Sequence, residues 1–203
     1  MISHDFKTIF IHIPKTAGTS IEAMFGFVQM EQKSFTDMTE GKHWNARYMK
    51  EEDLDSFERY YKWTVVRDPW EKELSLYNMM SRGMKYRHYD FKGFLKEVTL
   101  PRIKKSRENN AEYGKPGFVF ADQTDFFTDG AGNVMVDKIV RYENLEAEWK
   151  SICKTINKRY EELPRLRAVK KKSMSYYYDQ ECIDMVAAAR KADIDYLKYN
   201  FKF

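Results

Sequence analysis

The sequence predicts an α/β fold in which helices flank a central parallel sheet. Three short segments are rich in β-branched and apolar residues, as buried strands are, and they cover Lys7–Ile13, Lys62–Arg67 and Val134–Tyr142. A stretch with helical spacing of apolar side chains comes after each of them. Strands that alternate with helices indicate a parallel sheet covered by helices. The length of 203 residues fits one domain over residues 1–203.

The helices are assigned from the spacing of their apolar side chains. Pro14 ends the first strand, and Thr19–Phe25 then places its apolar residues on one helical face. Asp68 and Pro69 end the second strand, and Trp70–Met80 follows with apolar residues three and four positions apart. Further helices are expected over Met49–Tyr60, Glu143–Tyr160 and Asp179–Tyr199.

The composition argues against several classes of protein. A hydrophobic content of 43% and an aromatic content of 16% are too high for a disordered chain. The net charge of +4 is too small to indicate a nucleic-acid-binding protein, although positive charge gathers in Pro101–Arg107 and Arg165–Lys172. No apolar run approaches the ~18 residues of a membrane span, and none follows Met1 as in a signal peptide. We therefore expect a cytoplasmic protein without stable membrane insertion.

The two cysteines, Cys153 and Cys182, form no CxxC pair and have no close histidine cluster. A structural zinc site is therefore not expected. Two buried thiols in a reducing compartment are the expected state, with a single disulfide as the alternative.

The segment Ile11–Glu22 (IHIPKTAGTSIE) leads from a strand through a tight loop into a helix. Backbone N–H groups at such a junction attract anions, and Lys15 adds a full positive charge. Gly18 lets the backbone approach a ligand, and further hydroxyl donors come from Thr16, Thr19 and Ser20. The order differs from the GxxxxGK[ST] loop of nucleoside triphosphate enzymes, because a proline replaces the first glycine and the lysine comes early. The alternative is a side-chain-capped helix start beside a solvated lysine.

A second anion pocket is predicted where the next strand ends, at Arg67. If the two strands are parallel, Arg67 emerges at the same carboxyl edge as the first loop, where ligands of open α/β sheets bind. Ser75 lies eight residues further on and can face back toward it. An arginine fork with a hydroxyl suits a second phosphate. The alternative is a structural Arg67–Asp68 pair with Ser75 on a helix surface. Two such pockets predict a nucleotide with phosphates at two ends.

These motifs resemble those of sulfotransferases that use 3′-phosphoadenosine 5′-phosphosulfate (PAPS), especially the carbohydrate branch with the heparan sulfate 2-O- and chondroitin sulfotransferases. FIHIPKTAGTSIE is similar to the 5′-phosphosulfate loop of that family, and TVVRDPWEKELSLYN to its 3′-phosphate motif. VDKIVRYENLEAEW and the tail YYYDQECIDMVAAARKADIDYLKYNF resemble further shared blocks. The resemblance covers residues 9–78 and 119–201, and it implies a P-loop-like three-layer sandwich.

The resemblance also implies a reaction: the transfer of a sulfuryl group from PAPS to an acceptor hydroxyl, without a metal. It places Lys15 at the leaving oxygen, and Arg67 with Ser75 at the 3′-phosphate. The donor-binding residues that it implies are Lys15, Thr16, Ala17, Gly18, Thr19, Ser20, Arg67 and Ser75.

His43 is the candidate base, because it resembles the histidine of a glycine–histidine block in the family, with Lys42 inserted after the glycine. Histidine titrates near neutrality, which suits a base. The alternatives are the carboxylates of Glu22 and Glu40, or a surface histidine that only caps a helix. The late basic run Lys170–Ser173 can close over the donor by the same resemblance.

The acceptor is predicted only as a hydroxylated molecule. An anionic glycan is one candidate, and a lipid or a small metabolite is another. The charges of Arg102, Lys104, Lys105 and Arg107 can meet such a glycan or simply form a solvated helix face. Two other functions stay open: a P-loop kinase-like phosphotransferase that needs magnesium and ATP, and a non-catalytic nucleic-acid-binding protein.

Overall fold

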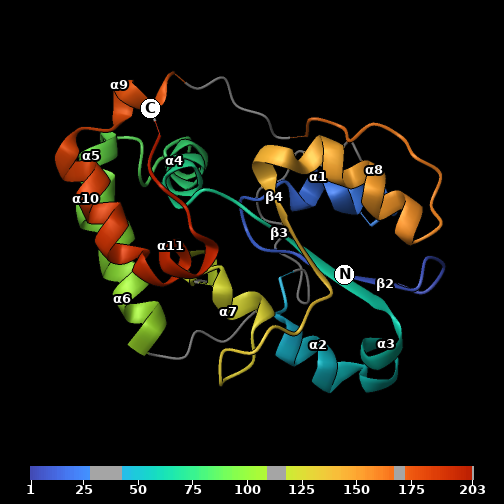
Figure 1. Cartoon of the computed structure of the whole chain (residues 1–203). Coiled ribbons are helices and arrows are strands. Elements are labelled where there is room, and N and C mark those ends of the chain that lie inside the picture. The colour runs from blue at the N-terminus through green and yellow to red at the C-terminus, as the bar shows by residue number, and fades with distance from the viewer. Residues whose placement is uncertain (28–42, 109–117, 167–171, 203) are drawn as a thin grey trace.

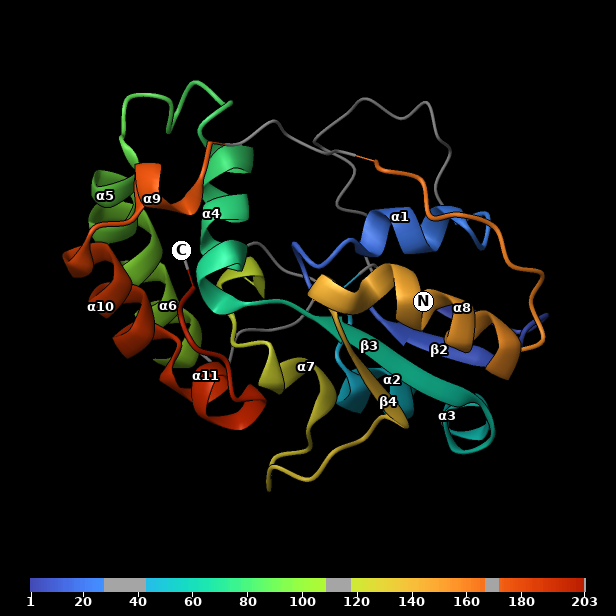
Figure 2. The same ribbon diagram turned by 45° about the horizontal axis from the view of Figure 1, so that its top comes forward.

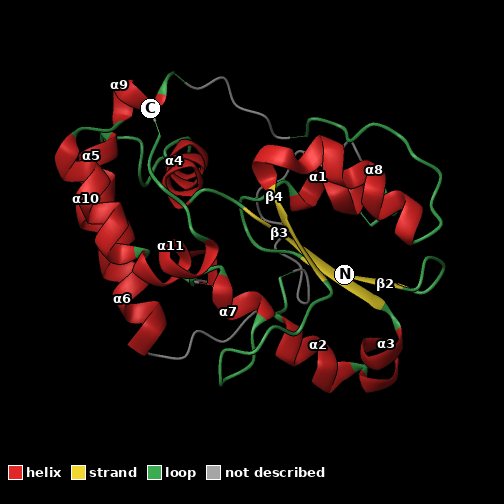
Figure 3. Ribbon diagram, viewed as in Figure 1, coloured by secondary structure: helices red, strands yellow, loops and turns green. Residues whose placement is uncertain are grey.

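The computed structural model describes residues 1–27, 43–108, 118–166 and 172–202. Its sheet has the strand order β1-β2-β3-β4, with bounds Ile2–Ser3, Thr8–Ile11, Tyr61–Val66 and Lys138–Arg141. β2, β3 and β4 are parallel (Figure 3). β1 pairs antiparallel with β2. The predicted parallel sheet with flanking helices is therefore confirmed. The sequence missed β1, because a strand of two residues has no periodicity to detect.

Threonine side chains link β2 to β3 in addition to the backbone ladder. Ile11 pairs with Thr64, whose Oγ1 donates to the carbonyl of Ile11 over 2.8 Å. At the other end, Oγ1 of Thr8 donates to the carbonyl of Tyr61, also over 2.8 Å. Since the strands are parallel and in this register, the segments that leave them start at one edge of the sheet.

Alternate strand residues face two different helical layers. Phe10, Trp63 and Val65 pack against α1 (Gly18–Ala23) and α8 (Leu145–Thr155). Their neighbours on the opposite face pack against α2 (Ala46–Glu52) and α3 (Leu54–Arg59), and they include Ile9, Ile11 and Val66. Figure 1 shows these two pairs of helices on opposite sides of the strands. The period of two along each strand thus builds a three-layer sandwich.

A group of helices extends from one end of the sheet (Figure 2). It comprises α4 (Pro69–Met80), α5 (Phe91–Phe94), α6 (Leu100–Glu108), α7 (Thr124–Phe127), α9 (Met174–Tyr177), α10 (Gln180–Ala189) and α11 (Lys191–Leu197). A π-helical turn, Leu95–Thr99, joins α5 to α6, and a 3₁₀ turn, Phe118–Phe120, precedes α7. The stretch 81–118, which matched no family block, is therefore largely helical where it is described.

Two long helices of the sequence-based expectation are each broken in two. Met49–Tyr60 divides at Asp53, whose carboxylate accepts from the backbone N–H of Ser56 over 3.0 Å and so begins α3. Asp179–Tyr199 divides at Arg190, which is fully buried and ion-paired with Glu73 over 2.8 Å. The helix ends there because the backbone of Arg190 leaves the helical conformation, with φ −109° and ψ 23°.

The third strand and the helix that follows it are shorter than expected. Of the expected strand Val134–Tyr142, only Lys138–Arg141 pairs with β3. A 3₁₀ turn over Tyr142–Asn144 follows it and delays the start of α8. Val134 instead forms an isolated bridge with Thr128.

Candidate functional site

The loop between β2 and α1 is held in a tight, partly left-handed conformation. Lys15 and Ala17 have φ angles of 71° and 70°, which L-residues rarely adopt. Thr16 lies between them, and its buried hydroxyl donates to the carbonyl of Ile13 over 2.8 Å. The Thr16 side chain therefore stabilises the loop itself, and only its backbone can face a ligand.

Gly18 is required by the packing beneath the loop. A Cβ on Gly18 would lie 1.9 Å from Cδ2 of His12. The His12 ring is itself fixed, because its Nδ1 lies 2.8 Å from Oε1 of Glu22 and both side chains are buried. The close approach predicted for Gly18 thus occurs toward the protein interior. Glu22 lies in the same buried pair, which places this rival base beneath the loop.

The start of α1 has no side-chain cap. Its N-cap residue is Ala17, and no side-chain hydrogen bond caps the helix. Ser20 is buried, and its hydroxyl accepts from the backbone N–H of Leu166 over 3.3 Å. Thr19 is half-buried. The alternative of a side-chain-capped helix start is therefore wrong, and the amide end of α1 is left to other partners.

Lys15 is half-buried, and it points across the sheet edge. Its Nζ lies 3.3 Å from Sδ of Met79 in the last turn of α4. Its backbone carbonyl accepts a hydrogen bond from Nη1 of Arg67 over 3.2 Å. The first loop and the end of β3 are thus in direct contact, as the parallel arrangement predicted.

The guanidinium of Arg67 is held on several sides. Nη2 lies 2.7 Å from Oε2 of Glu71, and the group stacks 4.1 Å above the ring of Tyr142. Arg67 is 8% exposed, and its Nε is buried with no hydrogen-bond partner among the described residues. Asp68 instead caps α4 by accepting from two backbone N–H groups. The alternative of an Arg67–Asp68 pair is therefore wrong.

Glu71 and Ser75 follow Arg67 at intervals of four residues. α4 therefore places both of them on one helical face, and Glu71 reaches the guanidinium. Ser75 is half-buried at the second of these positions. Glu71 and Tyr142 were not predicted as part of the site. The spacing of Arg67 and Glu71 could have indicated the ion pair, whereas no local signal indicated the stacked ring.

His43 lies against the end of β2. Its Nδ1 is 3.0 Å from the carbonyl of His12, and its ring stacks on Phe118 with centroids 4.8 Å apart. A carbonyl can only accept, so the neutral imidazole carries its proton on Nδ1 and its lone pair on Nε2. Asn45, not His43, caps α2 by accepting from the N–H of Tyr48 over 2.8 Å. The helix-capping alternative for His43 is therefore wrong.

Several other expected residues turn out to have structural contacts or cannot be placed. Arg107 pairs with Asp122 over 2.9 Å, and Arg102 donates to the hydroxyl of Tyr86 over 2.6 Å. Cys153 and Cys182 are both free and buried, as predicted. Outside the described residues lie Glu40, Gly41, Lys42, Lys170 and Lys171.

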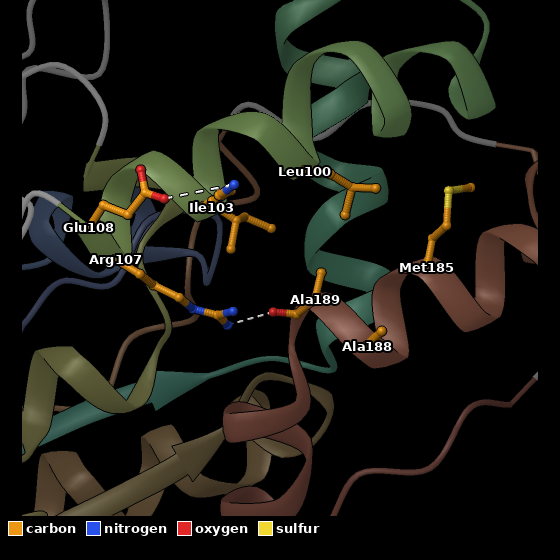
Figure 4. Close-up of a pocket in the computed structure, with 8 residues that line it drawn as sticks. Leu100, Ile103, Arg107, Glu108, Met185, Ala188 and Ala189 are labelled. Atoms are coloured by element: carbon orange, nitrogen blue, oxygen red, sulfur yellow. Dashed lines mark hydrogen bonds and ion pairs between the residues drawn. The ribbon is translucent and has the colours of Figure 1, made fainter.

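A groove of about 480 Å³ lies between α6 and α10, and its lining includes Lys104 and Arg107 (Figure 4). Its lining is mostly apolar, from Leu100 and Ile103 on one side to Met185 and Ala188 on the other. The lining includes none of the residues predicted to bind the donor or to act as the base.

Two features are absent from the described residues. No group of three or more histidine, cysteine or acidic side chains is arranged there to hold a metal ion. In the same ranges, no helix has the length and apolar character needed to cross a bilayer.

A mostly parallel sheet with a strand-to-helix loop and an arginine at its carboxyl edge is an arrangement typical of α/β proteins that bind phosphorylated ligands. Within this class, the model of the sulfotransferase family matches residues 1–194, and the chain belongs to that family. The match includes the stretch 81–118, which the motif resemblance did not cover. Comparisons with curated proteins and with solved structures gave no match.

Proposed function

We propose that the protein moves a sulfuryl group from PAPS to a hydroxyl of an anionic carbohydrate. The family supports sulfuryl transfer in general. The contact between Arg67 and the carbonyl of Lys15 is the observation that carries the rest, because it brings the two predicted phosphate pockets to one sheet edge. The single domain over residues 1–203 and the cytoplasmic location stay predictions from the sequence.

The residues at this edge fit the donor. The buried Nε of Arg67 is a cationic donor without a partner among the described residues, and such a group favours an anionic ligand. We assign the 3′-phosphate to Arg67 and Ser75. The 5′-phosphate is assigned to the loop residues Lys15, Thr16, Ala17, Gly18, Thr19 and Ser20. Thr16 and Ser20 contribute mainly backbone amides, because the structure uses both of their hydroxyls internally.

Two residues are assigned to the chemical step. Bound PAPS supplies the sulfuryl group, whose bond to the phosphate oxygen breaks as the bond to the acceptor oxygen forms. The ammonium of Lys15 stabilises the charge that develops on the leaving oxygen. Nε2 of His43 takes the acceptor proton, while its Nδ1–H stays bonded to the carbonyl of His12. That bond keeps the imidazole in the tautomer that a base needs.

The segment 81–90 supports an anionic acceptor. It begins next to Met79, the contact of Lys15, and it is anchored where the hydroxyl of Tyr77 donates to the carbonyl of Tyr89 over 3.1 Å. Its outward side chains include Arg82, Lys85 and Arg87, which are exposed and form no ion pair with described residues. We call these three residues the basic loop. Unpaired cations beside the proposed transfer site attract an anionic substrate.

Two measurements test the proposal. Calorimetry should detect binding of 3′-phosphoadenosine 5′-phosphate without magnesium and little binding of magnesium–ATP. Transfer of labelled sulfate from PAPS to pooled glycans, lipids and metabolites should label an anionic glycan. Lys15→Ala should abolish the labelling and weaken bisphosphate binding. Tight ATP binding with none of the bisphosphate would instead establish a kinase-like enzyme. Strong, salt-sensitive nucleic-acid binding that survives Arg67→Ala would establish the non-catalytic alternative.

A further inference from the structure

Gln123 clamps the backbone of Arg67. Its Oε1 accepts the Arg67 N–H and its Nε2 donates to the Arg67 carbonyl, both over 2.9 Å. Arg67 is the first residue after β3, so these two bonds continue the pairing of the strand by one residue. Gln123 is fully buried, which excludes water as a substitute partner.

Gln123 is in turn fixed by Asp193, a fully buried residue of α11. Oδ2 of Asp193 accepts the backbone N–H of Gln123 over 2.9 Å. Oδ1 accepts the backbone N–H of Thr124 over 3.0 Å and its hydroxyl over 3.2 Å. A carboxylate with three donors holds the start of α7 firmly, because charge-assisted hydrogen bonds are the stronger kind. Asp193 of α11 therefore supports the contact between Gln123 and Arg67.

The two hydrogen bonds from Gln123 fix the part of Arg67 that its other contacts leave free, the backbone. The guanidinium is held by the carbonyl of Lys15, by Glu71 and by the ring of Tyr142. None of these contacts fixes the backbone from which the side chain extends, and Gln123 does. A bidentate phosphate contact requires a guanidinium placed within about 0.5 Å, and a side chain fixed in advance loses less entropy on binding.

We infer that Gln123, supported by Asp193, is the positioning residue that lets Arg67 recognise the 3′-phosphate of the donor. This inference rests on the proposed function. Gln123 touches no ligand in this role: it acts through the backbone of Arg67. It predicts a specific defect, namely loss of the contribution of the 3′-phosphate to binding, with the rest of the nucleotide bound as before.

The experiment compares two ligands that differ only in this phosphate, 3′-phosphoadenosine 5′-phosphate and adenosine 5′-phosphate, by calorimetry. Gln123→Met keeps the length of the side chain and removes both bonds to Arg67. We expect the preference of the protein for the bisphosphate to fall about tenfold or more, the scale of a lost charged hydrogen bond. The affinity for adenosine 5′-phosphate should stay within about twofold of wild type on the same reasoning.

The matched control is Thr128→Val at the other end of α7. It removes the bond from the Thr128 hydroxyl to the carbonyl of Thr124, over 2.9 Å, without touching Arg67. It should retain the full preference. Gln123→Glu keeps an acceptor for the Arg67 N–H but places a carboxylate oxygen against the Arg67 carbonyl, so its preference for the bisphosphate should also fall. Gln123→Glu also tests the inference if Gln123→Met does not fold.

The outcomes separate the inference from the proposed function. A wild-type protein with no preference for the bisphosphate contradicts the proposed function itself. A wild-type preference that survives in Gln123→Met, or in Gln123→Glu if the former does not fold, overturns the inference alone. An equal loss of affinity for both ligands also overturns it, because it shows a general structural role.

Discussion

The guanidinium of Arg67 donates a hydrogen bond from Nη1 to the backbone carbonyl of Lys15, across 3.2 Å and 52 positions of sequence. This contact exists because β2 and β3 are adjacent and parallel, so the residues that leave their carboxyl ends meet. One positive group approaches from the loop before α1 and another from the start of α4. A ligand with two separated phosphates can therefore contact both.

His43→Ala should lower turnover about 100-fold or more, the scale of a lost general base. Its affinity for 3′-phosphoadenosine 5′-phosphate should be unchanged, because the donor residues stay in place. The measurement is steady-state sulfuryl transfer together with calorimetry. His4→Ala is the control, since His4 is exposed and bonds to Tyr60 on the surface. Unchanged turnover in His43→Ala removes this histidine from the mechanism.

Gly18→Ala should destabilise the fold and weaken donor binding. The new Cβ would lie 1.9 Å from the His12 ring, and that ring cannot withdraw without breaking its pair with Glu22. Overpacking of this kind costs about 1–3 kcal/mol of unfolding free energy. Gly130→Ala is the control, because its Cβ would meet only Nη1 of Arg47, at 3.8 Å. Urea denaturation measures both, and equal stabilities would show that the loop has room that the structure does not indicate.

Replacement of the basic loop by serine, at Arg82, Lys85 and Arg87 together, should raise the KM for an anionic acceptor about tenfold or more and make it less dependent on salt. The affinity for the donor should not change. The control replaces Lys150, Lys154 and Arg159, which are exposed in and after α8 and give the same change in charge. A KM that moves equally in both triple variants would mean that only net charge matters.

Lys72→Met should change how stability depends on pH. Burial, with Arg190 nearby, lowers the pKa of Lys72 from 10.5 to about 8. Between these pH values the unfolded chain binds a proton that the native state lacks, so the free energy of unfolding contributed by this residue rises with pH. The advantage of Lys72→Met over wild type should therefore shrink by roughly 2–3 kcal/mol between pH 7 and pH 10. Urea denaturation at several pH values measures it, and a constant difference contradicts the buried charge.

The sequence was most informative where the signal is local. The strand, loop and helix around Lys15 form one continuous stretch, and apolar runs with a following proline indicate such a junction without knowledge of the rest. The position of Ser75 in α4 also follows from local periodicity, while its role at the 3′-phosphate stays a prediction. The family motifs lie in these local stretches.

The sequence alone thus indicated the three parallel strands, the helices α1, α4 and α8 that follow them, and the loop between β2 and α1, because these depend on near neighbours in the chain. Tertiary structure decided the rest. It showed that the His12 ring leaves room only for a glycine at position 18. It also showed that Gln123, supported by Asp193, bonds to the backbone of Arg67. It also showed that Arg190 is buried where the sequence suggested a continuous helix. A polar residue normally indicates a solvated surface, and only partners brought together by folding can make its burial favourable.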